Sequence, residues 1–264
     1  MPRPVSVTYR VWPIAAEVAA GAAELFASAA AAAAEAHGVA RIAISGGSTP
    51  KVMFTLLADR SQPYFARVPW DKLHLFWVDE RCVPPTDAES NYRMTNEALL
   101  SKVPLPAAQI HRMKGELDPA VAASQYEAVI REEFGLDRSG DPVFDLVLLG
   151  MGDDGHTASL FPHTAALYEM VRLVVANHVL QKETWRVTLT WPVINRGREV
   201  AFLIEGAAKT DVLHDVLLGA YDPEAKPSQL IRPASGKLTM LLDSAAAAKL
   251  PATGTDGVGT LELS

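Results

Sequence analysis

The chain has 264 residues, of which 49% are hydrophobic and 21% charged, as in a folded globular protein rather than a fibre or a disordered chain. The net charge of -7 argues against general binding to nucleic acid or anionic membranes, which need a basic face, although a local basic pocket for a small anion stays open. A single cysteine, Cys82, excludes an internal disulfide and a thiolate metal cluster, which fits a reducing compartment.

The N-terminal segment has no apolar stretch followed by a small-residue cleavage site, so we expect no secretory signal and a cytoplasmic location. The alanine-rich stretch 14–36 has the length of a membrane span. Three glutamates interrupt it, Glu17, Glu24 and Glu35, and alanine is only weakly apolar. We therefore interpret the stretch as a packed helix that ends at Gly38.

Strand-like and helix-like segments alternate along the rest of the chain. Strands are predicted at "RIAIS", "LHLFWV", "FDLVLL", "RVTLTW", "EVAFLI" and "LTMLLD". Helices are predicted from Pro50, near 88–100, near 119–134, from Ala207 and, briefly, from Ser244. This alternation of near-continuous apolar runs with helices predicts an α/β fold with a mainly parallel sheet covered on both faces. We expect one domain over residues 1–250 and a loosely held, polar tail over 251–264.

Ligands of such sheets bind beyond the carboxyl ends of the strands, so the loops that follow the strands are candidate sites. The first, "SGGSTPK", follows "RIAIS". Gly46 and Gly47 let backbone N–H groups approach an anion, and Ser48 or Thr49 can cap the next helix. A tight turn without a ligand is an equal alternative.

The second loop, "DERCVPP", places Asp79, Glu80 and Arg81 where a buried apolar strand emerges. Charges at such a place need partners or a ligand. An ion pair within the loop is the alternative to a functional role. We interpret Cys82 as incidental, with a reactive thiol as the alternative.

The third loop, "GMGDDGHTASLF", follows "FDLVLL" and spells G-x-G-x-x-G at positions 150, 152 and 155. A pyrophosphate cradle presents uncharged N–H groups, so Asp153 and Asp154 would repel the phosphates. That fingerprint also needs an acid after the next strand, and the candidate strand "LVVA" is followed by Asn177. We therefore reject a dinucleotide site.

Asp154, Gly155 and His156 instead form a glycine-flexed turn at a strand exit, where a carboxylate can orient an imidazole as a general base near neutral pH. A structural histidine is the alternative. His163 lies seven residues further on, without the i, i+4 spacing of a helical zinc pair, so the indication of a metal is weak.

The fourth loop, "EGAAKTDVL", places Lys209 in the first turn of a predicted helix, whose dipole attracts anions. Arg186, at the start of "RVTLTW", is a further candidate cation. For both residues the alternative is a solvated surface charge.

The segments "SGGSTP", "DERCVPPTDAESNY", "GMGDDGHTASLFP", "RVTLTWPVIN" and "GAAKTDVL" keep the order typical of the 6-phosphogluconolactonase family, and the sequence from about Ile42 to Leu250 resembles that family. The resemblance implies a modified Rossmann-like, doubly wound fold shared with glucosamine-6-phosphate deaminases and ribose-5-phosphate isomerases. It implies hydrolysis of 6-phosphoglucono-δ-lactone to 6-phosphogluconate, the second step of the oxidative pentose phosphate pathway, without a cofactor or metal. We expect a small-molecule partner and a monomer, with a weak dimer as the alternative.

By the same resemblance, the catalytic residues are His156 as the general base, Asp154 as its partner, and Arg81 with Asp79. The resemblance assigns the substrate phosphate to seven residues, Ser45, Gly46, Gly47, Ser48, Thr49, Arg186 and Lys209. One departure is Met240, where many relatives have a tryptophan, and it concerns packing more than chemistry.

Two alternatives remain open. A related deaminase has a loop similar to D-G-H-I-A-F-N-E, whose glutamate supports the histidine, but the fifth residue after His156 in this chain is Phe161. A sugar-phosphate sensor is the second alternative. It would normally carry a DNA-reading segment, and no basic recognition segment precedes Ile42.

Overall fold

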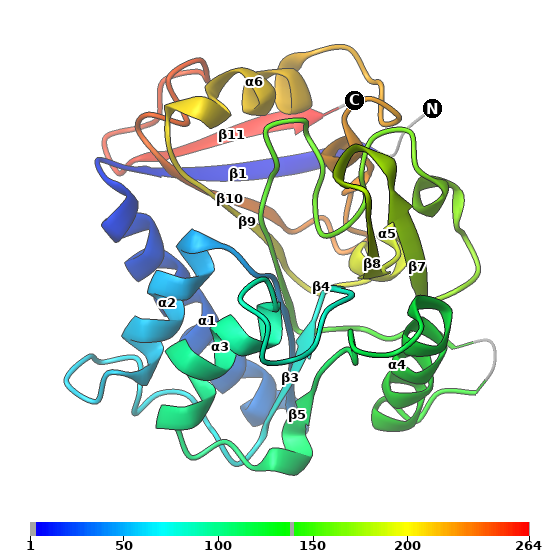
Figure 1. The fold of residues 1–264 in the computed structure, drawn as a ribbon. Coiled ribbons are helices and arrows are strands. Elements are labelled where there is room, and N and C mark those ends of the chain that lie inside the picture. Colours follow the sequence, from blue (N-terminus) through cyan, green and yellow to red (C-terminus); the bar gives the residue numbers. More distant parts are fainter. Residues whose placement is uncertain (1–3, 138–139, 264) are drawn as a thin grey trace.

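An eight-stranded sheet runs through the computed structural model, which describes residues 4–137 and 140–263 (Figure 1). Within these residues the strand order is β11-β1-β10-β9-β6-β2-β3-β5, and all neighbours are parallel except β11, which runs antiparallel to β1. The strands are β1 (Val5–Trp12), β2 (Ala40–Ile44), β3 (Leu73–Trp77), β5 (Ile110–His111), β6 (Leu146–Leu149), β9 (Val200–Ile204), β10 (Leu238–Asp243) and β11 (Val258–Leu263). The prediction of a mainly parallel sheet is confirmed.

Successive side chains of a strand point to opposite faces of the sheet. Both faces are apolar here, and helices cover each of them. Ile42 and Ile44 pack under α1, α2 and α3, whereas Ala43 faces the side of α4, α5 and α6. The helices are α1 (Ala15–His37), α2 (Ser48–Ala58), α3 (Asn91–Ala98), α4 (Pro119–Glu133), α5 (Trp191–Ile194) and α6 (Thr210–Leu218). The doubly wound arrangement expected from the family resemblance is therefore present.

The alanine-rich stretch forms α1, as predicted. Gly38 ends the helix in the left-handed conformation at φ 78°, and its N–H donates to the carbonyl of Ala34. By length and composition alone α1 could cross a membrane, and it lies near the N-terminus. In this structure Phe26 and the buried alanines of α1, among them Ala22, Ala23 and Ala27, pack against the sheet.

A second, antiparallel sheet of β4 (Asp79–Arg81), β8 (Thr184–Leu189) and β7 (Val174–Val179) lies beside the first. The strand predicted at "RVTLTW" is present as β8, but it lies in this second sheet and not in the main one. Residues 180–183, which join β7 to β8, are too few for the crossover that a parallel pair requires, so these two strands form a hairpin. The "DER" segment pairs with β8, which brings Arg81 opposite Arg186.

The chain end also differs from its prediction. Residues 258–263 of the expected loose tail form the edge strand β11, beside β1 (Figure 1). Leu261 and Leu263 pack against the core, and Gly259 makes room for the ring of Tyr9. The helix predicted from Ser244 is absent, because residues 244–248 form turns and Pro251 follows closely.

Candidate active site

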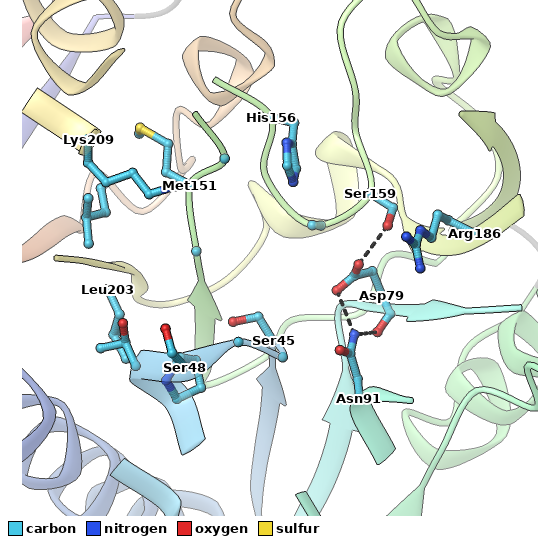
Figure 2. Close-up of a pocket in the computed structure, with 18 of the residues that line it drawn as sticks. Ser45, Ser48, Asp79, Asn91, Met151, His156, Ser159, Arg186, Leu203 and Lys209 are labelled. Atoms are coloured by element: carbon cyan, nitrogen blue, oxygen red, sulfur yellow. Dashed lines mark hydrogen bonds between the residues drawn. The ribbon is translucent and has the colours of Figure 1, made fainter. Parts of the chain in front are cut away.

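A pocket of ≈ 260 Å³ lies at the carboxyl ends of β2, β6 and β9, next to β4 and β8 (Figure 2). The structure brings ten of the eleven predicted site residues to its wall: Ser45, Gly46, Gly47, Ser48, Thr49, Asp79, Arg81, His156, Arg186 and Lys209. The eleventh, Asp154, touches His156 without lining the pocket. The pocket is therefore where the loops after the strands were expected to meet.

The glycine loop between β2 and α2 supplies one wall. Gly47 has φ 120°, a conformation that side chains rarely adopt, and a Cβ on Gly46 would lie 1.9 Å from Oδ1 of Asn91. The first N–H groups of α2 have no acceptor within the helix, and the buried hydroxyl of Ser45 has no hydrogen-bond partner among the described residues. Several hydrogen-bond donors are thus left for a ligand.

Asp79 is held in a fixed orientation in a second wall (Figure 2). Ser159 Oγ donates to its Oδ2 at 2.7 Å, and Asn91 Nδ2 donates to its Oδ1 at 3.4 Å and to its carbonyl at 2.9 Å. Sequence reasoning assigned no role to Asn91 or Ser159. Both lie in the quoted motifs, "ESNY" and "GHTASLF", but nothing local in those motifs links them to Asp79.

Glu80 does not line the pocket and instead accepts hydrogen bonds at the start of α3. Its carboxylate accepts the N–H groups of Asn91 and Tyr92, each at 2.8 Å. Burial raises the pKa of Glu80, while these backbone hydrogen bonds oppose the rise. Arg81 Nη1 donates to the carbonyl of Glu89 at 2.5 Å, and the ion pair within "DER" that we left open as an alternative is not found among the described contacts.

Arg186 and Arg81 face each other in the register of β4 and β8. Burial lowers the pKa of Arg186 and the charge of Arg81 lowers it further, whereas Asp79 and Glu89 raise it. Nη1 of Arg186 is buried and has no hydrogen-bond partner among the residues the structure describes. Two neighbouring guanidiniums, one of them incompletely paired, make this side of the pocket attractive to an anion.

His156 is fixed on three sides. Its Nδ1 lies 2.5 Å from Oδ1 of Asp154, and its ring stacks on Phe161 with the centroids 3.9 Å apart. A Cβ on Gly152 would lie 2.0 Å from the same Nδ1, so only glycine leaves room there. If Nδ1 donates to the carboxylate, Nε2 is the nitrogen that can accept a proton.

Asp154 is ionised at neutral pH. Partial burial raises the pKa of this carboxyl, but the hydrogen bond from His156 and its charge lower the pKa to about 2 overall. The exposed carboxylate of the neighbouring Asp153 takes a different partner and forms an ion pair with Lys209. Lys209 lies just before α6, in the short turn Ala207–Lys209, and lines the pocket on the side away from Arg186 (Figure 2).

The fold and pocket together define a doubly wound α/β protein with donors for a small anion and an oriented histidine. A family model for glucosamine-6-phosphate isomerases/6-phosphogluconolactonase matches residues 13–240. The chain belongs to this glucosamine-6-phosphate isomerase/6-phosphogluconolactonase family.

The chain is 42% identical over 215 residues to a 6-phosphogluconolactonase from Synechocystis, covering 81% of this chain and 86% of the relative. The structure of 6-phosphogluconolactonase from Trypanosoma cruzi superimposes with a TM-score of 0.79 at 30% identity, over 96% of this chain and 98% of that one. A monomeric glucosamine-6-phosphate deaminase shares the fold, with a TM-score of 0.74 at 18% identity over 91% of this chain and 98% of that one.

Proposed function

We propose that this protein hydrolyses 6-phosphoglucono-δ-lactone to 6-phosphogluconate, the second step of the oxidative pentose phosphate pathway. The observation that carries the proposal is the pocket itself, in which a glycine loop with free donors and two arginines share one cavity with His156, whose ring is paired with Asp154. Family membership and the lactonases named among its relatives support the same reaction.

The phosphate group of the substrate binds the N–H groups of the loop 45–49, Arg186 and Lys209. This arrangement uses a helix N-terminus together with cations, the two features by which proteins commonly hold phosphate. Asp79 is already oriented by Ser159 and Asn91, so it can accept a hydrogen bond from a sugar hydroxyl without rearranging.

The reaction then needs one base. Nε2 of His156 takes a proton from water while the water oxygen attacks C1 of the lactone, and the carbonyl becomes a tetrahedral oxyanion. Arg81 or a loop amide stabilises that negative charge. When the bond from C1 to the ring oxygen breaks, the imidazolium returns its proton to that oxygen, and the new carboxylic acid ionises in water.

The neighbour of His156 favours lactone hydrolysis over deamination. In the related deaminase loop the fifth residue after the histidine is an acid, whereas here the apolar ring of Phe161 stacks on His156 at that position. Deamination of an amino sugar would lack that carboxylate, while hydrolysis of a lactone does not require it.

The test is acid release from freshly generated lactone near neutral pH, with spontaneous hydrolysis measured without protein. We expect wild type to accelerate release. His156→Ala should lower kcat by about 10²- to 10⁴-fold, the usual contribution of a general base, with a small change in KM. Lys209→Ala should chiefly raise KM.

His163→Ala is the matched control, because His163 also faces a carboxylate, Glu224 at 3.4 Å, but lies outside the pocket. Full turnover by His156→Ala would show that the base is misassigned. If wild type does not accelerate hydrolysis above the spontaneous rate, the lactonase proposal fails. Tight binding of 6-phosphogluconate would then favour a sensor. Turnover of glucosamine 6-phosphate would instead favour a deaminase.

We further propose that the protein acts in the cytoplasm as a monomer with this small molecule as its partner. Binding to nucleic acid or membranes is not expected at a net charge of -7.

A further inference from the structure

Three ligand-type side chains converge at the edge of the main sheet, outside the pocket. His74 lies in β3, His111 in β5, and Glu133 is the last residue of α4, so three separate segments contribute to the group. None of the three lines the active-site pocket. Sequence reasoning did not find this group, because the residues are far apart in the chain and form no spaced motif.

The distances between the ligand atoms suit one small metal ion. His74 Nδ1 lies 3.1 Å from His111 Nε2 and 3.2 Å from Glu133 Oε2, and the last two atoms are 3.8 Å apart. A tetrahedral zinc ion with bonds of about 2.0–2.1 Å places neighbouring ligand atoms about 3.3–3.4 Å apart. We propose that His74, His111 and Glu133 bind a zinc ion, with water as the fourth ligand.

The surroundings support a cation with nitrogen ligands. Glu133 brings a negative charge to the C-terminal end of the fifteen-residue helix α4, where the helix dipole also favours cations. The ring of His111 is held by stacking on Phe76, with the centroids 4.4 Å apart. Arg41 is the opposing charge, but its Nη2 is engaged by the carbonyl of Glu133 at 2.9 Å and its guanidinium lies over the ring of Phe134.

The site is partly buried but open to solvent. Burial lowers the pKa of His111 to about 4 and also lowers the pKa of His74, although the nearby Glu133 opposes both shifts. The side chains of His74 and Glu133 are 23% and 28% exposed, so an ion and its water ligand can reach the site from solvent.

Among metal ions without redox chemistry, zinc is the one that this set of ligands favours. Magnesium and calcium prefer sites made of oxygen ligands, whereas two imidazoles and one carboxylate at tetrahedral spacing suit zinc. The bound ion would join the end of α4 to β3 and to β5, which is only two residues long. Its role would be to stabilise this edge, separately from catalysis.

The test uses full-length, tag-free protein stripped with a chelator. Zinc is titrated in competition with a fluorescent zinc indicator, and thermal unfolding is followed in parallel. We expect one zinc ion to bind and to raise the melting temperature. His74→Gln and Glu133→Gln should each weaken zinc binding by about 100-fold or more. Loss of a residue that only hydrogen-bonds to a metal ligand already lowers metal affinity by about 10- to 100-fold. Cobalt bound in place of zinc should give the intense visible absorption of a tetrahedral site.

Two variants serve as controls. His163→Gln alters another histidine–glutamate pair, for which the described residues offer no third ligand, and His156→Gln removes the candidate base. Both variants should bind zinc as tightly as wild type does. The proposal is overturned if wild type binds no zinc more tightly than His74→Gln does, or if His156→Gln alone abolishes binding. Because His74 and Glu133 are partly exposed, we expect both variants to fold without zinc. Far-UV circular dichroism and thermal unfolding in excess chelator check this for each variant.

Discussion

His156 and Asp79 differ in how their side chains are positioned, and the difference decides what the sequence can predict. The partners of His156 are Asp154 and Phe161, which lie in the same loop, so the sequence could predict the carboxylate–imidazole pair. Asp79 depends on Ser159, eighty positions away in the chain, and on Asn91. Those contacts exist only after the long-range packing of the two sheets has formed, so sequence reasoning had no signal for them.

Cys82 provides a test at the scale of one residue. Burial raises the pKa of its thiol to about 11 from an ordinary 9.0. Since only the thiolate is alkylated, and a raised pKa leaves less of it below pH 11, the reaction at pH 8 should be about 100-fold slower than for an unperturbed thiol. The rate should keep increasing as the pH rises toward 11.

Iodoacetamide labelling followed by mass spectrometry measures this rate, with urea-unfolded protein as the unperturbed control. Cys82→Ser should retain lactonase activity, because Cys82 does not line the pocket. Labelling of the native protein at the unfolded rate would contradict the assignment of Cys82 as an unreactive thiol.

At the scale of elements, the loop after β6 shows why a glycine spelling alone does not define a cofactor site. Gly152 is needed because a Cβ there would lie 2.0 Å from Nδ1 of His156 and 2.7 Å from Oδ1 of Asp154. A Cβ on Gly150 would meet nothing within 4 Å. The two glycines of this G-x-G are therefore constrained differently. Gly152 must lack a side chain to make room for the imidazole of His156, whereas Gly150 has free space around it.

Gly152→Ala should therefore lower kcat by about 10²-fold, the loss that a shift of about 1 Å in a catalytic group can cause. Gly150→Ala should lower kcat much less. Neither glycine has a positive φ, so alanine causes no backbone strain at either position. Steady-state kinetics and melting temperatures of both variants test this, and equal losses in the two would show that the clash with His156 is not the cause.

The strands of the main sheet could be predicted because buried parallel strands are near-continuous apolar runs. The edge strand β11 could not, because its sequence "VGTLEL" contains glycine and polar residues and its burial depends on β1, at the other end of the chain. The same limitation applied to β4 and β8, whose pairing partners no local pattern records.

A pair of variants tests whether β11 stabilises the fold. Leu261 is half-buried against the core, so Leu261→Ala should lower the free energy of unfolding by about 1–2 kcal/mol. Glu262 is exposed on the same strand, and Glu262→Gln should stay within about 0.5 kcal/mol of wild type. Urea unfolding measures both. Were the chain end loosely held, as its composition first suggested, the Leu261 variant would unfold like wild type.

At the scale of the whole molecule, a net charge of -7 coexists with a pocket lined by Arg81, Arg186 and Lys209. The bulk composition excluded broad anionic partners, but it could not locate this local excess of cations. The excess arises from three segments that are distant in sequence, the strands β4 and β8 and the turn before α6, and that the fold brings together at one pocket.

The proposal that the protein acts as a monomer can be tested by dilution. If the active site needs no second copy, the activity per mole of protein should stay constant on dilution from about 1 µM to about 1 nM. Light scattering after size-exclusion chromatography gives the mass at the upper end of that range. A fall in specific activity on dilution, accompanied by a dimer at high concentration, would show that a partner completes the site.

The ion pair between Lys209 and Asp153 means that the proposed phosphate site contains its own competing anion. A substrate that binds Lys209 must displace the Asp153 carboxylate, which is 74% exposed and can turn into water at small cost. Chloride or another single negative charge gains little from this exchange, whereas a doubly charged phosphate ester gains more attraction than the carboxylate gives up. We therefore expect the ion pair to favour the binding of dianions over that of the abundant monoanions of the cell.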